Sequence, residues 1–428
     1  MAALLSVELE SCSDKNSLQG APMLRNDRND APPRFLFDAT LELVTVRAVM
    51  IKSDQSYTPR SRSRRITPDW TGSALTREST LHQLSPYIGK IKSTIAASLI
   101  KTYSQAGELV YDPFSGSGTV ALEGWLAGRR VLANDLSPYA WTLTQGKLSP
   151  YTSLQTALSD LETVSQRVEL LTPSIDLRAV PKCVRVFFHS ETLREVVAWT
   201  KVLKKRKSYF FLSCLLGILH HQRPGFLSFP SSHTVPYLRT KRFPRSRFPA
   251  LYSYRSVRDR LEAKVRRAMK RAPGLDFTLY RSCVSKDAAS FTPPFAVDTI
   301  ITSPPYMRQL DYGRDNRLRL WFVGAADWKE LDNKVTPSEA DFLDLMRQCL
   351  ALWRGMLRPK GYCVLVFGDT WSRVYRMPLP QAVTSIALRE IGGYSLHDKC
   401  TDSIPDVRRV RRNCRGSLSE TIIVLKKD

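Results

Sequence analysis

Strand-like and helix-like apolar segments alternate along two parts of this 428-residue chain, and this alternation limits the possible folds more than any other feature. In the first part the patterns predict helix 95–103, strand 108–114, helix 119–127, strand 130–135 and helix 139–147. In the second part they predict strand 277–281, strand 299–302, helix 341–357, strand 362–367, helix 381–391 and strand 420–425. Strands that alternate with helices form βαβ units around a parallel sheet. The sequence therefore predicts an α/β fold.

The two alternating parts, residues 80–150 and 275–428, are expected to form one domain. Residues 151–274 lie between them and have mainly helical patterns, which indicates an insertion. Residues 1–79 are turn-rich and charged, and are expected to be a poorly structured N-terminal arm. No apolar run reaches the roughly 20 residues that cross a bilayer. The eight cysteines include no C-x-x-C pair, which argues against a zinc site and favours the reducing cytoplasm.

The chain is strongly basic, with 64 Lys and Arg against 40 Asp and Glu, a formal net charge of +24. A field of this sign attracts polyanions such as nucleic acid, although anionic lipid and ribosomes would also fit it. The inserted region is especially basic between residues 239 and 271. The candidate nucleic-acid-binding residues, interleaved there with phenylalanines, are Arg239, Lys241, Arg242, Arg245 and Arg247. A solvated basic face is the alternative interpretation.

A glycine-rich loop follows the first expected strand and opens the next helix. Its residues are Asp112, Pro113, Phe114, Ser115, Gly116, Ser117, Gly118 and Thr119. The glycines allow a tight turn and close approach of a ligand, and the helix N-terminus offers N–H groups to an anion. Asp135, at the end of the next strand, stands where a doubly wound sheet faces a cofactor ribose. The loop is neither a Walker loop nor a dehydrogenase fingerprint, because Asp-Pro replaces their first residues and no Gly-Lys-Ser/Thr follows.

A second motif, Ser303-Pro304-Pro305-Tyr306, ends the expected strand 299–302. Two prolines in succession remove two N–H donors and stiffen the loop. The Ser303 hydroxyl and the Pro304 carbonyl are then fixed acceptors for an amino group, and Tyr306 supplies a flat face for stacking a base. Taken alone, the motif would equally fit a turn that ends a strand.

Together these motifs resemble the S-adenosylmethionine-dependent amino-methyltransferases of DNA, which make N4-methylcytosine or N6-methyladenine. The resemblance covers about residues 80–150 and 275–428 and implies a Rossmann-like sheet with S-adenosyl-L-methionine as cofactor. Residues 112–119 are similar to the family's methionine-binding motif and Asp135 to its ribose-binding acid. Asp287 resembles its acid near the adenine, and Tyr87 lies in a segment similar to its cofactor-side loop before the glycine loop. Residues 303–306 resemble its catalytic motif.

Within that family, Ser-Pro-Pro-Tyr is associated mainly with cytosine N4, so the resemblance implies a bacterial, cytoplasmic, site-specific DNA methyltransferase acting on N4 of a flipped-out cytosine. The expected partner is double-stranded DNA, with a cognate restriction endonuclease if the chain belongs to a restriction–modification pair; no membrane and no metal are required. The sequence argues against cytosine-C5 methylation, because that reaction needs a Pro-Cys nucleophile and the sequence contains no Pro-Cys dipeptide. Three alternatives stay open: adenine N6, guanine N2 in RNA, and a catalytically silent nucleic-acid binder.

Overall fold

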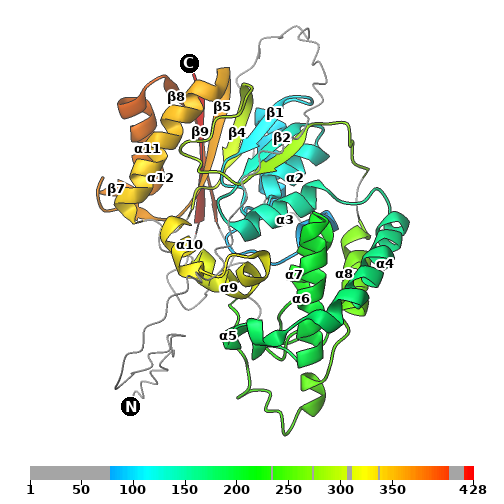
Figure 1. Cartoon of the computed structure of the whole chain (residues 1–428). Helices are drawn as coiled ribbons and strands as arrows, with labels where there is room; N and C mark the ends of the chain where they lie inside the picture. The colour runs from blue at the N-terminus through cyan, green and yellow to red at the C-terminus, as the bar shows by residue number, and fades with distance from the viewer. Residues whose placement is uncertain (1–77, 233–234, 272–273, 306–310, 336–337, 404–418) are drawn as a thin grey trace, which may run out of the picture. The chain divides into compact units, whose positions relative to one another are not determined.

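The computed structural model describes residues 78–232, 235–271, 274–305, 311–335, 338–403 and 419–428, all within one compact unit, Ser63–Asp428. The N-terminal arm expected over residues 1–79 thus lies almost wholly outside the described residues. A seven-stranded sheet, ordered β3-β2-β1-β4-β5-β9-β8, forms the centre of this unit (Figure 1). Its strands are β1 (Leu109–Asp112), β2 (Arg130–Asn134), β3 (Arg281–Val284), β4 (Val297–Thr302), β5 (Leu357–Gly368), β8 (Tyr394–Ser403) and β9 (Ser419–Lys427).

The direction of the strands defines one functional edge of the sheet. Strands β1 to β5 all pair in parallel, and only β9, between β5 and β8, runs antiparallel to its neighbours. The chain moves outward from β1 through β2 to β3, then returns to β4 on the other side of β1. In such Rossmann-like sheets the ligand site lies beyond the carboxyl ends of the strands at this reversal. The fold prediction is confirmed, and the topology directs attention to the ends of β1 and β4.

Helices cover both faces of the sheet, which is why the central strands β1 and β4 are buried along their whole length. In β5, alternate residues from Tyr362 to Val366 face a core that includes α1, while those from Cys363 to Phe367 face the core of α11 and α12. The flanking helices are α1 (Ser93–Tyr103), α2 (Thr119–Leu126), α3 (Pro138–Leu148), α11 (Glu339–Met356), α12 (Leu379–Ser385) and the π-helical turn Ile386–Ile391. Helices α9 (Tyr312–Val323) and α10 (Trp328–Val335) contribute to the core of the helical region instead.

The region between the two alternating parts is helical. Its helices are α4 (Leu154–Leu171), α5 (Lys182–Arg185), α6 (Ser190–Lys205), α7 (Tyr209–Ile218) and α8 (Val257–Met269). They share one continuous hydrophobic core with α2 and α3 of the sheet domain. Two glycines make this contact close: a Cβ on Gly146 of α3 would lie 2.3 Å from the Ser213 hydroxyl of α7, and one on Gly217 would lie 2.0 Å from the Leu84 carbonyl oxygen.

Two details differ from the sequence prediction. The strand expected over residues 277–281 begins only at Arg281, because the Asp276 carboxylate accepts hydrogen bonds from the backbone N–H and hydroxyl of Thr278 and forms a turn. Strand β8, helices α9 and α10, and the short hairpin of β6 (Trp371–Ser372) and β7 (Met377–Pro378) were not predicted. Within the described ranges, no helix is long and apolar enough to cross a membrane.

Candidate functional site

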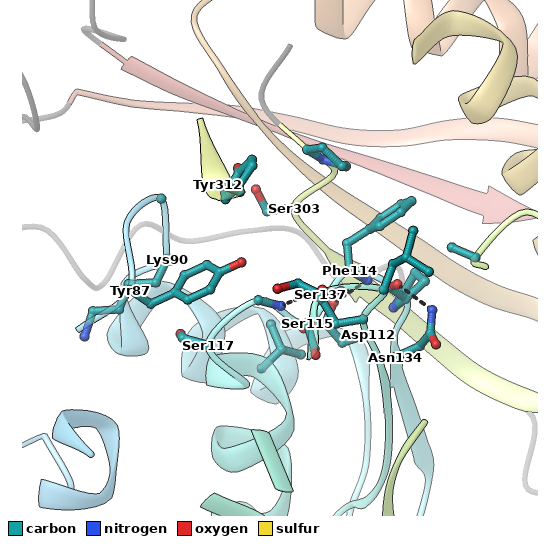
Figure 2. A pocket seen from close by; sticks show the side chains of 18 of the residues that line it. Tyr87, Lys90, Asp112, Phe114, Ser115, Ser117, Asn134, Ser137, Ser303 and Tyr312 are labelled. Carbon is teal, nitrogen blue, oxygen red and sulfur yellow. Dashed lines mark hydrogen bonds between the residues drawn. The ribbon is translucent and has the colours of Figure 1, made fainter. Parts of the chain in front are cut away.

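A cavity lies at the carboxyl ends of β1 and β4 and is open to solvent, with about 910 Å³ of empty space when the solvent at its mouth is included (Figure 2). Segments far apart in the sequence line it. The predicted residues among them are Tyr87, Asp112, Pro113, Phe114, Ser115, Gly116, Thr119, Asp135, Asp287, Ser303 and Pro305. Those not predicted include Lys90, Asn134, Ser137, Lys334 and Leu345, and Tyr312, which follows the second motif closely in the sequence, lines the cavity as well. Of the remaining predicted residues that the structure describes, Gly118 and Pro304 are not among the lining residues.

The glycine-rich loop has the tight geometry that its sequence predicts. Gly116 and Gly118 both have positive φ, at 50° and 70°, where other residues are strained. A Cβ on Gly118 would also lie 2.7 Å from the Thr144 hydroxyl and 3.0 Å from its Cα. Helix α2 begins directly after Gly118, and no side chain caps it. The first N–H groups of α2 are therefore available at the cavity, as an anion site requires.

A buried hydrogen bond joins the glycine loop to the strand that carries the second motif. The Thr302 hydroxyl donates to Oδ1 of Asp112 at 2.7 Å and accepts from the Phe114 N–H at 3.2 Å. Asp112 is only 2% exposed. Burial raises its pKa to about 7, although the hydrogen bonds from Thr302 and Phe114 oppose part of that rise. Asp112 therefore has a structural role in fixing the two loops, in addition to lining the cavity.

Asp135 closes the same loop from the end of β2. One carboxylate oxygen accepts from the Gly116 N–H at 2.7 Å and the other from the Ser137 N–H at 2.9 Å. Burial raises its pKa to about 6, and both backbone hydrogen bonds act against this shift. Each oxygen has a further lone pair for a ligand hydroxyl, so the geometry is compatible with the predicted ribose contact.

Asn134 was not predicted, and it holds two walls of the cavity together. Its side-chain amide donates to the Pro113 carbonyl at 3.1 Å and to the Lys286 carbonyl at 3.0 Å. Its oxygen accepts from the Lys286 N–H at 2.9 Å. The neighbouring Asp287 lines the cavity, and its carboxylate accepts from the Ala289 N–H. Asn134 thereby positions Asp287 relative to the glycine loop.

Three tyrosines form a row from the floor of the cavity towards the second motif. The rings of Tyr139 and Tyr87 are stacked with centroids 5.9 Å apart, and Tyr312 follows Tyr87 at 6.3 Å. The Tyr87 ring lies against Gly116, where a Cβ would be 3.1 Å from it. Burial, and secondarily the nearby Asp135, raise the pKa of Tyr87 well above its ordinary value, so its phenol stays neutral.

The second motif reaches the cavity through Ser303 and Pro305 at the end of β4. Tyr306 lies outside the described residues. Figure 2 shows Tyr312, at the start of α9, beside Ser303. The sequence signal for Tyr312 is its position shortly after the motif, but nothing local shows that it turns back to the cavity.

The five predicted nucleic-acid-binding residues lie on one loop of the helical region, and all but the half-buried Arg239 are exposed. Guanidinium groups lie over neighbouring rings: Arg242 over Phe243, Arg245 over Tyr252 and Arg247 over Phe248, at 5.5 to 5.8 Å. Buried Arg255 holds the loop by donating to the carbonyls of Phe226, Ser228 and Leu251. The basic loop is thus a shaped surface with its charges outward.

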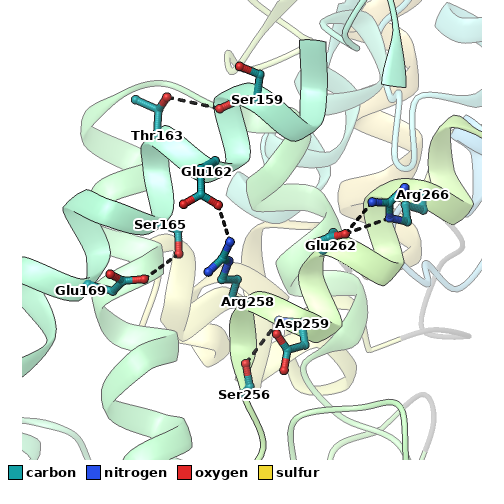
Figure 3. A network of polar contacts seen from close by, with 10 residues as sticks. All are labelled: Ser159, Glu162, Thr163, Ser165, Glu169, Ser256, Arg258, Asp259, Glu262 and Arg266. Carbon is teal, nitrogen blue, oxygen red and sulfur yellow. Dashed lines mark hydrogen bonds and ion pairs between the residues drawn. The ribbon is translucent and has the colours of Figure 1, made fainter. Parts of the chain in front are cut away.

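Helix α8, the other part of the basic stretch, offers less charge to a partner. Arg258 pairs with Glu162 of α4, and Arg266 pairs with Glu262 at 2.7 Å, as Figure 3 shows. The first pair joins α4 and α8, whereas the second lies within α8. Both satisfy part of the charge of α8.

The residues present fit S-adenosylmethionine. The uncapped N-terminus of α2 suits a carboxylate, Asp135 suits ribose hydroxyls, and the carboxylates of buried Asp112 and half-buried Asp135 suit a nearby positive charge. Phe114 and Leu345 supply apolar lining. Among the described residues no group of His, Cys, Asp and Glu could hold a metal ion.

Residues 84–183 match the family described as RMKL-like, methyltransferase domain. A 75-residue segment is 29% identical to the type II methyltransferase M.MjaII of Methanocaldococcus jannaschii, which is 18% of this chain and 14% of that protein. The chain thus matches about one seventh of the length of this relative. Residues 84–183 thus resemble part of a methyltransferase domain, which agrees with S-adenosylmethionine as the predicted cofactor.

Solved structures with a similar arrangement include TrmN from Thermus thermophilus, 14% identical with a TM-score of 0.33 over 83% of this chain and 53% of that one. The rRNA methyltransferase aviRa from Streptomyces viridochromogenes is 13% identical, with a TM-score of 0.32 over 82% of this chain and 91% of that one. Likenesses this weak carry no argument about substrate, which rests on the site itself.

Proposed function

We propose that this chain is a site-specific DNA methyltransferase that transfers a methyl group from S-adenosylmethionine to the exocyclic N4 amino group of a flipped-out cytosine. The observation that carries the proposal is that Ser303 and Pro305 line the same cavity as the glycine-rich loop. The proposed cofactor site and the stiff loop of hydrogen-bond acceptors therefore share one cavity.

Bound S-adenosylmethionine supplies a methyl group on a positively charged sulfur, open to attack by an amine. The chain's own contribution is to orient that amine. The Ser303 hydroxyl and the Pro304 carbonyl accept its N–H groups and direct the nitrogen lone pair towards the cofactor side of the cavity. As the new N–C bond forms and the S–C bond breaks, positive charge grows on the nitrogen, and these oxygens stabilise it until a proton leaves to water.

Tyr312 is the residue we assign to the target base. It stands at the start of α9 beside Ser303, in ring contact with Tyr87 at 6.3 Å. An aromatic ring in this position can stack on a base whose amino group faces Ser303. Tyr306, the stacking residue predicted from the sequence, lies outside the described residues. Its stacking role is part of the proposal.

The nucleic-acid part of the proposal is supported by the charge of +24 and by the exposed basic loop. Phosphate contacts from Lys241, Arg242, Arg245 and Arg247 would give sequence-independent affinity and hold a duplex near the cavity. Base extrusion is required because an exocyclic amino group inside a stacked duplex cannot reach a cavity within the protein. A partner endonuclease is part of the proposal only if the target is a restriction site.

The test is mass spectrometry of nucleosides from unmethylated genomic DNA and from total RNA, each incubated with the purified chain and isotopically labelled S-adenosylmethionine. Label in N4-methylcytosine is expected. Label in N6-methyladenine keeps the mechanism and changes the base, and label only in N2-methylguanine of RNA overturns the DNA assignment. Absence of cofactor binding would identify a silent nucleic-acid binder.

A variant pair separates catalysis from folding. Ser303→Ala is expected to lower methyl transfer at least 100-fold while cofactor affinity stays within about threefold, because one of the amine's acceptors is lost. Ser149→Ala, at the exposed end of α3, is the matched control and should leave both unchanged. Equal loss of transfer and cofactor binding in Ser303→Ala would show that the loop is structural.

A further inference from the structure

A short hairpin of β6 and β7 leaves the sheet at the same edge as the cavity. Strand β5, which precedes it, runs parallel to β4, and Leu365 pairs with Thr302, the residue before Ser303. Trp371 follows Leu365 by six residues, at most roughly 20 Å of extended chain. The hairpin Trp371–Pro378 therefore begins on the same edge of the sheet as the second motif, and none of its residues lines the cavity.

The hairpin presents an unusual surface for a soluble domain. Trp371 is 59% exposed and Val374 is 61% exposed, whereas Trp125, Trp199 and Trp353 are buried. Arg373 and Arg376 are exposed as well, and residues 370–378 contain no acid. An exposed tryptophan followed by two exposed arginines combines a stacking face with charges that suit phosphate.

This surface is held in place from beneath. Glu339, at the N-terminus of α11, accepts from the Ser372 hydroxyl at 2.7 Å and from the Val374 N–H at 3.0 Å. Arg347 of the same helix donates to the Tyr375 hydroxyl at 2.8 Å. Helix α11 also contributes Leu345 to the cavity, so one rigid element supports both the hairpin and the cofactor site.

The backbone at the turn is strained. Arg376 has φ at +51°, a left-handed conformation that non-glycine residues rarely adopt, and the Leu379 N–H then donates to the Thr370 carbonyl at 2.8 Å to close the hairpin. Strain held by surrounding contacts is a feature of functional segments. The Trp and Arg side chains are thus displayed on a preorganised support.

We propose that hairpin Trp371–Pro378 is a second nucleic-acid contact beside the cavity, where Trp371 stacks on an exposed base or sugar and Arg373 and Arg376 bind phosphates. The inference rests on the proposed DNA methyltransferase function. It gives the duplex one contact on this hairpin and another on the basic loop of the helical region, with the flipped base entering the cavity.

The test measures binding of a fluorescein-labelled 30-base-pair duplex of mixed sequence over a range of salt, and KM for unmethylated genomic DNA. Trp371→Ala is expected to raise both the Kd and the KM about tenfold, with Trp371→Phe restoring most of the loss. The double variant Arg373→Ala/Arg376→Ala is expected to reduce the slope of log K against log salt by about 2. Affinity for S-adenosylmethionine should not change.

The controls lie on other exposed positions of the chain. Leu170→Ala removes an apolar side chain that is 85% exposed on α4, and Arg167→Ala/Arg185→Ala removes two exposed charges. These variants should behave as wild type. Wild-type Kd, KM and salt slope in both hairpin variants would overturn the inference while leaving the proposed function intact. If the wild-type chain methylates no DNA, the proposed function fails, and if it binds no duplex the hairpin inference fails too.

Discussion

The Thr302 hydroxyl donates to the Asp112 carboxylate across 2.7 Å between neighbouring strands, and it also accepts from the N–H of Phe114. One side chain therefore links the start of the glycine-rich loop to the residue that immediately precedes Ser303. The position of Ser303, the proposed acceptor for the amine, relative to the glycine-rich loop therefore depends on the contact between Thr302 and Asp112. Neither loop fixes it alone.

Replacing Thr302 tests that dependence. Thr302→Val removes the hydroxyl and leaves Asp112 and Phe114 each one partner short in a buried site, at a cost of about 1–3 kcal/mol in unfolding free energy. Cofactor affinity is expected to fall at least fivefold, measured by calorimetry alongside denaturant unfolding. The control is Thr299→Val on the same strand, whose hydroxyl donates to the Tyr103 carbonyl away from the cavity. It should lose stability and keep affinity; equal affinity loss in both would contradict the prediction.

Gly118 is expected to tolerate no side chain. In Gly118→Ala the positive φ costs about 1–2 kcal/mol, and the methyl group meets Thr144 at 2.7 Å, which adds overpacking of about 1–3 kcal/mol. Cofactor binding should fall at least tenfold because the start of α2 must shift. Gly107→Ala is the matched control, since its φ is +79° with no atom within 4 Å of the new Cβ. Thermal unfolding and calorimetry of both variants show whether the clash with Thr144 lowers stability and cofactor affinity more than the positive φ does by itself.

The pH dependence of cofactor binding follows from two carboxyls. Burial raises the pKa of Asp112 to about 7 and of Asp135 to about 6, so both gain negative charge as the pH rises from 5.5 to 8. Negative charge favours the sulfonium of S-adenosylmethionine, which S-adenosylhomocysteine lacks. The ratio of their affinities should rise about tenfold over this range, which corresponds to one pKa unit of coupling. Parallel pH profiles for the two ligands, measured by calorimetry, would show that these carboxyls do not face the sulfur.

Lys147, fully buried at the end of α3, is expected to destabilise the native state. Its ammonium nitrogen has no hydrogen-bond partner among the described residues, and burial lowers its pKa from 10.5 to about 7. The unfolded chain therefore binds more protons between pH 7 and 10.5, so this contribution makes the fold more stable as pH rises through that window.

Lys147→Met should accordingly raise the unfolding free energy by about 1–3 kcal/mol at pH 6, with a gain that shrinks towards pH 10. Denaturant unfolding at both pH values measures it. The exposed Lys101→Met on α1 is the comparison variant and should show no such pH trend. A loss of stability in Lys147→Met at pH 6 would mean that the buried ammonium has a stabilising contact.

Sequence reasoning found the parts of the site that local pattern determines. A glycine-rich loop after a strand, an acid at the end of the next strand and a Pro-Pro turn after β4 are each short, contiguous signals. The Asn134 clamp was missed because it depends on Lys286, 152 residues away, and only the pairing of β2 with β3 brings them together. The position of Tyr312 just after the Pro-Pro turn makes it a candidate for the cavity, but its place in the lining depends on how α9 packs, which local sequence does not determine.

The missing elements have a similar physical cause. Strand β8 is at the edge of the sheet and mostly exposed or half-buried, so it has no apolar run or clean alternation to reveal it. The hairpin of β6 and β7 has only two residues in each strand and is held by side chains of α11. The strand predicted over 277–281 was misplaced because Asp276 forms a turn with Thr278. A pattern of apolar residues does not reveal the hydrogen bond that holds this turn.

The continuous core between α3 and α7 has a consequence for engineering. Because Gly146 leaves no room for even a methyl group against Ser213, and Gly217 none against Leu84, the helical region is not a cassette that can be lifted out at residues 151 and 274. A chimera that exchanges it for another recognition region must also carry the facing surfaces of α2 and α3, which in turn support the glycine-rich loop. An exchange that changed the target preference would therefore also have to preserve cofactor binding. Selection on either property would limit the sequence changes that the other can accept.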